Sequence, residues 1–207
     1  MSGYEIASLT EIESVKAVGT LRWTPLRKHF GITAFGISAY TASEAGQDVV
    51  EEHTEEQLGH EELYVVVAGR ATFVLGGEEK DVPAGSVVFL RDPKLKRYAR
   101  AEEPNTTVLA VGGKPCSHEI SAWEYFFAAY GVVDDDPDRA VVEIQVGLAE
   151  KPDHPGLYFH LACIYCRAGR LGEAGVALDR ALELDPKLQK WADEDEDLEP
   201  LRVARKT

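Results

Sequence analysis

The sequence has no long hydrophobic run. Within its 207 residues, no stretch approaches the roughly 18 consecutive apolar residues that a membrane-spanning helix needs. The first residues, MSGYE, also lack the basic and then apolar segments of a secretory signal. These two absences argue against a spanning helix and predict a cytoplasmic protein.

Positive charge is scarce. The chain has 22 Lys and Arg residues against 36 Asp and Glu residues, so its formal net charge is -14. Residues 119–207 hold 19 acidic and 10 basic side chains, and residues 1–118 hold the remaining 17 and 12, so both halves are acidic. A field of this sign repels phosphate backbones and anionic lipids. We therefore expect no binding of nucleic acid or membranes.

Cysteine is also rare, and the three cysteines cannot all pair with one another. Cys163 and Cys166 make a Cys-x-x-Cys motif, but no second pair completes a four-thiolate zinc site. Their spacing of three also lets them share a helix face, where free cysteine packs as a small hydrophobic residue. We expect helix packing, with redox or metal chemistry as the alternative.

Between about residues 30 and 113, the chain reads as short β-rich segments separated by turns: FGITAFGISAY, ELYVVVAG, ATFVLGG, SVVFL and TTVLAV. Side chains alternate with a period of two and turns recur regularly, which is typical of an all-β barrel or sandwich. Gly76-Gly77 supplies positive φ angles, and Pro83-Ala84-Gly85 supplies a bend before the next strand. The pattern predicts adjacent antiparallel strands.

The periodicity changes after residues 112–115. From Ala122 onward, apolar residues recur every three or four positions, as in amphipathic helices. We therefore predict two domains: an all-β barrel over residues 1–115, with its core at about 30–113, and an all-α domain over residues 119–207. A shift of 34 residues superposes Ala140 on Ala174 and Pro152 on Pro186, which indicates an internal repeat.

The second copy, residues 155–186, resembles a tetratricopeptide repeat. Its eight signature positions hold Tyr158, Leu161, Ala162, Tyr165, Ala174, Leu178, Ala181 and Pro186. Small residues in such a repeat let two antiparallel helices approach, and the proline ends the second helix. The first copy, roughly residues 121–152, is more divergent. Residues 187–207, which include an acidic run at 193–197, are expected to form a solvated cap.

The β-rich part resembles the cupin superfamily. Glu62 followed by Gly69 fits the end of that family's first motif, G-x5-H-x-H-x3,4-E-x6-G. Gly77, Pro83 and Gly85 fit its second motif, G-x5-P-x-G-x2-H-x3-N. The resemblance covers roughly residues 30–113 and implies a cupin-like β-barrel.

The family's usual metal ligands are mostly replaced in this sequence. The histidines of the two motifs fall on Glu56, Leu58 and Val88, so only Glu62 of the four ligands is kept. One carboxylate cannot hold a catalytic metal, which needs about three protein ligands. If Leu58 and Val88 pack as apolar residues, we expect His60 and Glu62 to form a hydrogen-bonded pair inside the barrel.

Two interpretations of this pocket stay open, and both assume that the strand extends back to residue 56. In the first, a small ligand binds in a cavity lined by Glu56, His60, Glu62, Tyr64 and Val88. In the second, His60 and Glu62, joined by Glu56 or His53, hold a divalent transition metal such as zinc, iron or manganese.

The tetratricopeptide resemblance implies a concave groove that binds peptides. The groove positions include Tyr125, Phe159, Cys163 and Arg167, and the groove is mostly apolar. An apolar strip of this length is normally covered, so we predict that it packs on the barrel, on a second subunit or on a segment of another protein. The cupin resemblance implies a homodimer.

Two functional hypotheses follow. The leading one is a ligand-binding or protein-interaction protein, in which the barrel takes a small molecule and the helices contact a protein or peptide partner. The alternative is a metal-dependent enzyme that acts on a small molecule by Lewis-acid or oxygen chemistry at the displaced site. The two differ in whether the purified protein carries a metal.

Overall fold

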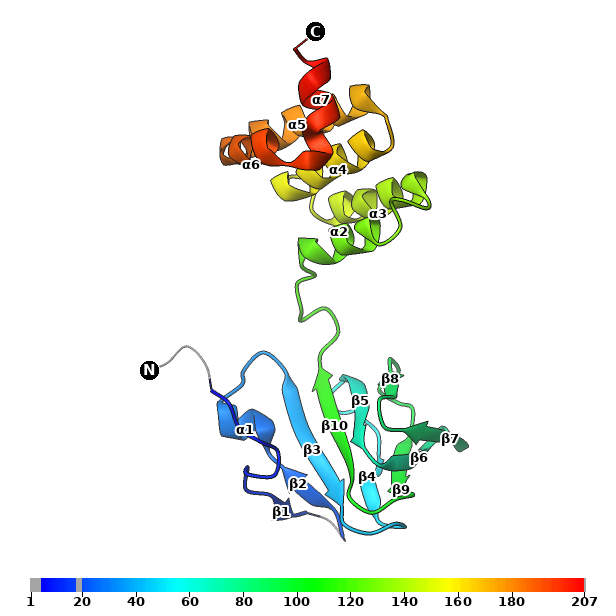
Figure 1. Cartoon of the computed structure of the whole chain (residues 1–207). Helices are drawn as coiled ribbons and strands as arrows, with labels where there is room; N and C mark the ends of the chain where they lie inside the picture. Colours follow the sequence, from blue (N-terminus) through cyan, green and yellow to red (C-terminus); the bar gives the residue numbers. More distant parts are fainter. Residues whose placement is uncertain (1–4, 18–19, 207) are drawn as a thin grey trace. The chain divides into compact units, whose positions relative to one another are not determined.

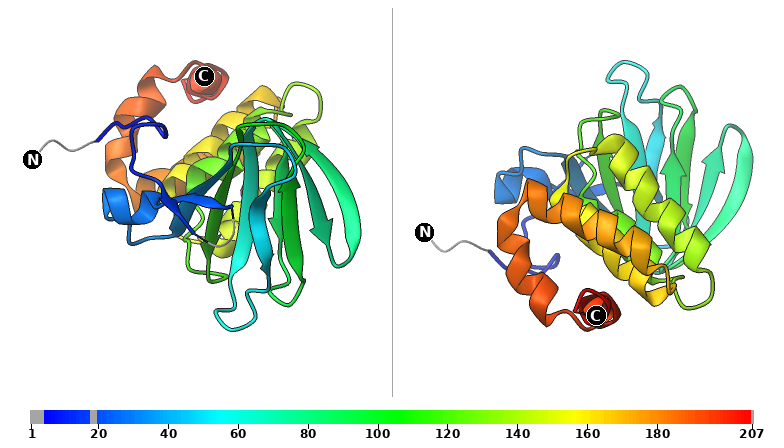
Figure 2. Two further views of the ribbon diagram at one scale, coloured as in Figure 1. Left: turned by 90° about the horizontal axis from the view of Figure 1, so that it is seen from below. Right: turned by 90° about the horizontal axis from the view of Figure 1, so that it is seen from above.

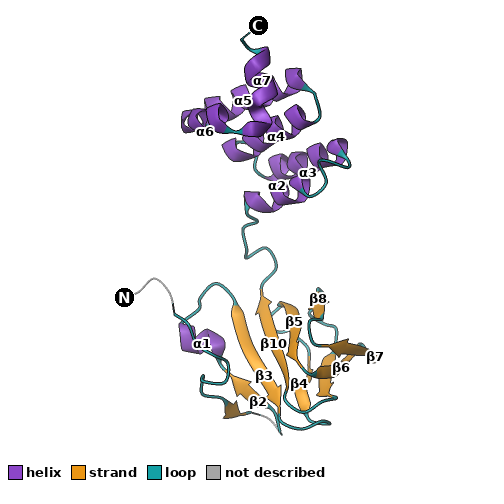
Figure 3. Ribbon diagram, in the orientation of Figure 1, coloured by secondary structure: helices purple, strands orange, loops and turns teal. Residues whose placement is uncertain are grey.

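The structure, a computed structural model, describes residues 5–17 and 20–206. It falls into two compact units, Met1–His118 and Glu119–Thr207. The N-terminal unit is rich in strands, and the C-terminal unit is helical (Figure 1, Figure 3). A sheet-rich half followed by a helical half is what the change of periodicity predicts.

Two antiparallel sheets and one short helix build the described part of the N-terminal unit. Their elements are β1 (Val15–Lys16), β2 (Arg22–Thr24), α1 (Leu26–Phe30), β3 (Gly36–Ala42), β4 (Asp48–His53), β5 (Glu61–Ala68), β6 (Arg70–Leu75), β7 (Glu78–Pro83), β8 (Val87–Leu90), β9 (Arg97–Ala101) and β10 (Thr106–Gly113). One sheet has the order β1-β2-β3-β10-β5-β8, and the other has the order β4-β9-β6-β7. Each strand pairing is antiparallel, as predicted.

The two sheets enclose one hydrophobic core. Side chains of β5 alternate, so Tyr64 and Val66 are buried while Val67 is exposed. The second sheet contributes Phe73 of β6 and Ala99 of β9 to the same core. The rings of Tyr64 and Phe73 lie 5.6 Å apart, centroid to centroid. Side chains of β5 and β9 therefore reach the same interior.

Two turns depend on glycine. Gly76 and Gly77 join β6 to β7 with φ angles of 58° and 91°, which confirms the predicted positive-φ turn. Gly69, between β5 and β6, has φ of 70°, and a Cβ there would lie 2.3 Å from Thr106 Oγ1. A larger residue at Gly69 would force β10 away from this turn.

Strand β5 begins at Glu61, so its expected extension back to residue 56 is wrong. The Gly59 N–H donates to the Glu55 carbonyl at 2.7 Å, and Gly59 has φ of 65°, which closes a turn before the strand. Leu58, expected to pack inside, is 59% exposed. Because this turn ends the alternation, the residues before Glu61 do not share the inward face of β5.

Four helices and a segment of shorter helical turns build the described part of the C-terminal unit. They are α2 (Ala122–Tyr130), α3 (Pro137–Glu150), α4 (Pro155–Arg167), α5 (Leu171–Leu184), η1 (Pro186–Leu188), α6 (Gln189–Glu194), η2 (Glu196–Leu198) and α7 (Glu199–Ala204). Among the described residues, no helix is long and apolar enough to cross a membrane.

Helices α4 and α5 lie side by side (Figure 2). The connection at residues 168–170 contains Gly169 with φ of 73°, which turns the chain back. Ala162 of α4 and Ala174 and Ala181 of α5 are fully buried, because side chains of this size let the helix backbones approach. These are three of the signature positions noted in the sequence.

Candidate functional site

A cavity of about 310 Å³ lies in the N-terminal unit. It is lined by Leu21, Tyr40, Val50, Glu51, His53, Thr54, Glu55, Glu62, Tyr64 and Ala110. Leu21, Val50 and Ala110 supply apolar wall, while three carboxylates, an imidazole and three hydroxyls supply polar groups. A cavity of this size and mixed lining suits a small molecule.

Three side chains of metal-ligand type converge on the cavity wall. His53 ends β4, Glu55 follows two residues later, and Glu62 is the second residue of β5. One ligand atom of each lies within 4.8 Å of the other two. His53 Nε2 is 3.8 Å from Glu55 Oε1 and 3.7 Å from Glu62 Oε2. These separations are too long for hydrogen bonds, although they allow ion pairs when His53 is protonated.

The neighbours of this cluster fix its orientation. His53 Nδ1 lies 2.7 Å from the Glu51 carbonyl oxygen, so Nδ1 carries the donated proton and Nε2 faces the cluster. The Tyr64 hydroxyl donates to Glu62 Oε2 at 2.6 Å. These two hydrogen bonds fix the orientation of the His53 ring and of the Glu62 carboxylate.

Arg97 of β9 places a positive charge beside the cluster. Its side chain is fully buried, and Nε lies 3.3 Å from Glu62 Oε2. The angles there do not make a hydrogen bond: Arg97 Nε and Nη2, like Glu55 Oε2, are buried without a hydrogen-bond partner. In the described part of the chain, only His160 Nδ1 joins them in that state. A buried polar atom that stays unpaired costs about 1–3 kcal/mol, so these atoms can accept or donate to a bound group or to water.

The contacts shift the protonation of the cluster. Burial raises the pKa of Glu62, but the contacts with His53, Tyr64 and Arg97 together outweigh it and leave that pKa below its ordinary value. The contact with Glu62 raises the pKa of His53, against the opposing effect of burial. Burial and Glu62 together raise the pKa of Tyr64, so its hydroxyl stays protonated and donates. The site therefore holds an ionised carboxylate beside an imidazole that protonates readily.

The predicted metal ligands are only partly brought together. His53 and Glu62 belong to the cluster. His60 lies beside it, with Nδ1 3.4 Å from Glu55 Oε2, and Glu56 is exposed and pairs with Lys94 at 3.7 Å. The expected His60–Glu62 pair is therefore wrong, because the turn before β5 directs His60 to Glu55.

The predicted cavity lining differs in a similar way. Glu62 and Tyr64 line the cavity, whereas Val88 does not. Val88 is the β8 partner of Tyr64 and packs against the hydrophobic core. Because the two residues are neighbours on one sheet, Val88 lies beside Tyr64 and not opposite it.

Glu55, Arg97 and Tyr40 are site residues that the sequence analysis missed. Glu55 follows His53 with the spacing His-x-Glu, which places both on one side of an extended segment. Arg97 lies two and four residues before the buried Ala99 and Ala101 of β9, so the alternation of a strand places all three side chains on the inward face. Tyr40 carries no comparable signal.

In the helical unit, the predicted groove is closed by the chain's own C-terminal segment. Phe159 and Cys163 of α4 are buried, and Arg167 lies near them at the edge. The ring of Trp191 in α6 lies 6.3 Å from that of Phe159, and Leu198 of η2 is fully buried. The barrel, a second subunit and another protein were the expected covers, and the C-terminal segment was not among them.

Tyr125, the remaining groove residue, serves packing between helices. Its ring lies where a Cβ on Gly147 of α3 would stand, at 2.6 Å, and its hydroxyl donates to Glu150 Oε2 at 2.6 Å. Because Gly147 leaves this space, α2 can pack closely on α3. Tyr125 is therefore held between α2 and α3.

A second cluster of ligand-type atoms joins Cys163 to Asp195 and Asp197. Burial raises the pKa of the Cys163 thiol, which therefore stays protonated. Asp197 accepts a hydrogen bond from the Tyr130 hydroxyl at 3.1 Å, and Asp195 accepts one from the Asp197 N–H at 2.9 Å. A protonated thiol beside carboxylates that already have partners agrees with the packing role expected for this cysteine.

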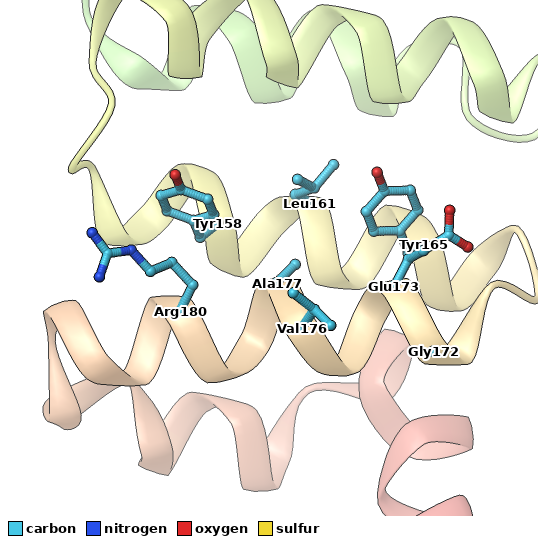
Figure 4. A pocket seen from close by; sticks show the side chains of 8 residues that line it. All are labelled: Tyr158, Leu161, Tyr165, Gly172, Glu173, Val176, Ala177 and Arg180. Carbon is cyan, nitrogen blue, oxygen red and sulfur yellow. The ribbon is translucent and has the colours of Figure 1, made fainter.

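A pocket of about 510 Å³ lies on the surface of α4 and α5 (Figure 4). It is lined by Tyr158, Leu161, Tyr165, Gly172, Glu173, Val176, Ala177 and Arg180. Arg180 pairs with Asp153 and Glu183, and Glu173 pairs with Arg170. With these charges already paired, the pocket mainly offers apolar surface.

The chain is similar to several solved structures. A cupin protein from Bacteroides fragilis is 20% identical, with 58% of this chain and 92% of that chain covered and a TM-score of 0.46. A sugar phosphate isomerase of the cupin superfamily from Silicibacter pomeroyi is 17% identical, covering 53% and 76%, with a TM-score of 0.44. Streptomyces Pac13, a nucleoside dehydratase, is 15% identical, covering 52% and 81%, with a TM-score of 0.40.

Sequence comparison adds no nearer relative. No protein-family model matches the chain, and no curated protein matches it. The similarity to proteins of the cupin superfamily thus extends over little more than half of the chain.

Proposed function

We propose that the N-terminal unit binds a small molecule in its cavity through a divalent transition metal held by His53, Glu55 and Glu62. One observation carries this proposal: the ligand atoms of the three side chains lie within 4.8 Å of one another, at separations too long for hydrogen bonds. One imidazole and two carboxylates at this spacing can serve as ligands of one ion.

The donor set fits such an ion. One imidazole nitrogen with two carboxylates suits zinc, iron or manganese. Glu55 Oε2 is buried and lacks a hydrogen-bond partner. The Glu51 carbonyl orients His53, and Tyr64 orients Glu62, which are the supporting contacts that metal ligands usually have.

When bound, the metal would supply Lewis acidity to an oxygen of the small molecule or of water. Three protein ligands leave a position free for that oxygen. Tyr40, Thr54 and Glu51 line the same cavity, so their oxygens can orient a polar ligand by hydrogen bonds. With these groups the unit would act either as a binding protein or, as the alternative hypothesis has it, as a metal-dependent enzyme on a small molecule.

Arg97 favours a second candidate, a binding pocket that works without metal. Its guanidinium is buried 3.3 Å from Glu62 and already supplies a positive charge beside this carboxylate. In that case His53 and Glu62 would exchange protons with the ligand as an acid and base pair. The ligand would then be a neutral or cationic molecule, because three carboxylates line the cavity.

Metal titration separates the two candidates. We expect the metal-free protein to bind about one equivalent of zinc or manganese in calorimetry, and Glu55→Gln and His53→Gln to weaken binding about tenfold or more. Glu56→Gln, a carboxylate next in sequence that faces solvent, is the matched control and should bind like the wild type. No uptake by the wild type, or equal uptake by Glu55→Gln, would leave only the metal-free pocket.

The homodimer implied by the resemblance is a further proposal, and edge strand β8 supports it. Val87 and Phe89 are exposed on β8, and β5 is its partner on one side. An edge with apolar side chains is a site for pairing with a second strand. We expect the wild type to sediment as a dimer and Phe89→Lys as a monomer, with Val67→Lys on the paired strand β5 as the control. A monomeric wild type would refute the dimer.

A further inference from the structure

The helical unit exposes three large aromatic side chains. Trp123 and Phe127 of α2 are 50% and 61% exposed, and Trp191 of α6 is 61% exposed. Aromatic side chains of this size are common at the centre of protein interfaces and uncommon on free surface. We call these three residues the aromatic patch.

Ring contacts connect the members of the aromatic patch across three helices. The rings of Trp123 and Phe127 lie 5.4 Å apart at an interplanar angle of 62°. From Phe127 the contacts continue through Phe126, His160 and Phe159 to Trp191, with centroid separations of 4.7, 4.2, 5.7 and 6.3 Å. The exposed rings are therefore supported by packed rings beneath them, which lowers the entropy that binding would cost.

The charges around the aromatic patch have one dominant sign. Residues 186–201 carry six carboxylates, at 193–197 and 199, and two lysines, at 187 and 190. Asp193, Glu194 and Glu196 are exposed and follow Trp191 within five residues of the chain, and Glu124 is exposed and follows Trp123 directly. In the described part of the chain, none of these four carboxylates takes part in an ion pair. Carboxylates without cationic partners next to exposed aromatic rings favour a cation.

From this charge complementarity we propose that the aromatic patch docks a basic segment of a partner protein, one that presents arginine or lysine side chains among apolar residues. Guanidinium and ammonium groups would lie over the faces of Trp123, Phe127 and Trp191 and pair with the carboxylates around them. Trp191 belongs to the segment that closes the groove, and its exposed side is the part offered to the partner. The inference does not depend on metal binding in the other unit.

A peptide titration of the full chain tests this surface. The probe is a short peptide of alternating arginine and leucine, and its two comparison peptides carry citrulline or glutamate in place of arginine. We expect the arginine peptide to bind and to quench tryptophan fluorescence, since two of the three tryptophans lie in the patch. The citrulline and glutamate peptides should bind roughly tenfold more weakly or not at all, and salt should weaken the arginine complex.

Matched variants locate the binding. Trp123→Ala with Phe127→Ala should weaken binding of the arginine peptide roughly tenfold, as expected for two interface aromatics. Val176→Ala, which removes a 73% exposed apolar residue from α5, should leave it unchanged. Circular dichroism establishes whether the variants fold. If the alanine variant does not fold, Trp123→Phe replaces it, because this change keeps an aromatic ring at the position.

Three results would overturn the proposal. Equal affinity for the arginine and citrulline peptides would show a surface that selects apolar residues and not charge. Full affinity in a folded patch variant would place the binding elsewhere. A wild type that sediments as a dimer and becomes monomeric through Trp123→Ala with Phe127→Ala would identify a second copy of the chain as the occupant.

Discussion

The two units bury different kinds of side chain. The buried polar and charged residues in the described part of the chain, Thr24, Arg97 and Thr106, all belong to the N-terminal unit. The interior of the C-terminal unit consists of alanine, valine, leucine, isoleucine, cysteine and aromatic residues. Burying a charge costs free energy that an apolar core avoids, so the polar interior is retained for something besides stability.

The helical unit carries its unusual side chains on its surface. The helical unit exposes Trp123, Phe127 and Trp191 beside uncompensated carboxylates, while its interior has no ligand-type group free of partners except His160 Nδ1 among the described residues. The proposed metal site therefore depends on the interior of the first unit, and the proposed docking surface depends on exposed side chains of the second. Three changes test this comparison, in order of decreasing expected effect.

The largest effect is expected at Arg97. Arg97→Met removes the buried charge beside Glu62 and should destabilise the N-terminal unit by about 3–5 kcal/mol, because the carboxylate is left without its partner. The measurement is the denaturant dependence of hydrogen exchange in β5 and β9 of the full chain. Exchange in α4 and α5 should stay as in the wild type if stability is lost within one unit only.

Two further variants sharpen this result. Arg100→Met removes the exposed arginine of the same strand, paired with Glu102 at 3.0 Å, and should cost less than about 1 kcal/mol. Arg97→Met combined with Glu62→Leu should recover most of the loss, since it removes both charges. If Arg97→Met proves as mild as Arg100→Met, the contrast between a polar and an apolar interior has no energetic basis.

The next largest effect is expected in the C-terminal segment. Leu198→Ala leaves a cavity under the closed groove and should destabilise the helical unit by about 2–5 kcal/mol. Hydrogen exchange of α4 should accelerate, because Leu198 lies in the segment that covers it. Val203→Ala, at a residue 56% exposed on α7, is the control and should change stability by no more than about 0.5 kcal/mol. Unchanged exchange in α4 would mean that the segment covers the groove without stabilising it.

Much of the fold could be predicted from sequence because the periodicity is strong. Alternation through β5 and the glycine pair at 76–77 specify strands and a turn locally, without knowledge of distant residues. The small residues Ala162, Ala174 and Ala181 likewise mark a close helix contact. By contrast, the cover of α4 by residues 186–204 is a tertiary contact, and the acidic run in that segment concealed Leu198 and Leu201, which are buried.

The candidate site was predicted only in part, for a physical reason that concerns register. Glu62 was identified from its position in the motif, and His53 was named as one of two alternatives for a third ligand. Glu55 and His60 lie in the turn around Gly59, where no periodicity fixes the direction of a side chain. Arg97 was not identified as a site residue, although its alternation with Ala99 and Ala101 in β9 points its side chain inward. The charge of Arg97 suggests an exposed side chain, and only the tertiary contact with Glu62 accounts for its burial.

The smallest effect concerns the protonation of His53, and it sharpens the distinction between a polar network and a fixed ion. In the metal-free protein, the contact with Glu62 raises the pKa of His53 above its ordinary value of about 6.5. The protonated imidazole then adds stability that is fully present below about pH 6.5 and is lost as the pH rises through the folded-state pKa. An NMR titration of the His53 ring in the presence of a chelator measures this midpoint.

Glu62→Gln removes the main cause of the shift and should lower the His53 midpoint, whereas Glu102→Gln, on the surface beyond β9, should leave it in place. A midpoint at the ordinary value in the wild type, or one unaffected by Glu62→Gln, would mean that His53 and Glu62 are not coupled in the absence of metal. Their spacing of 3.7 Å would then be maintained by the strands alone. In that event the cluster would be a site preformed for an ion. The second candidate function, in which His53 and Glu62 exchange protons with a ligand, would lose its support.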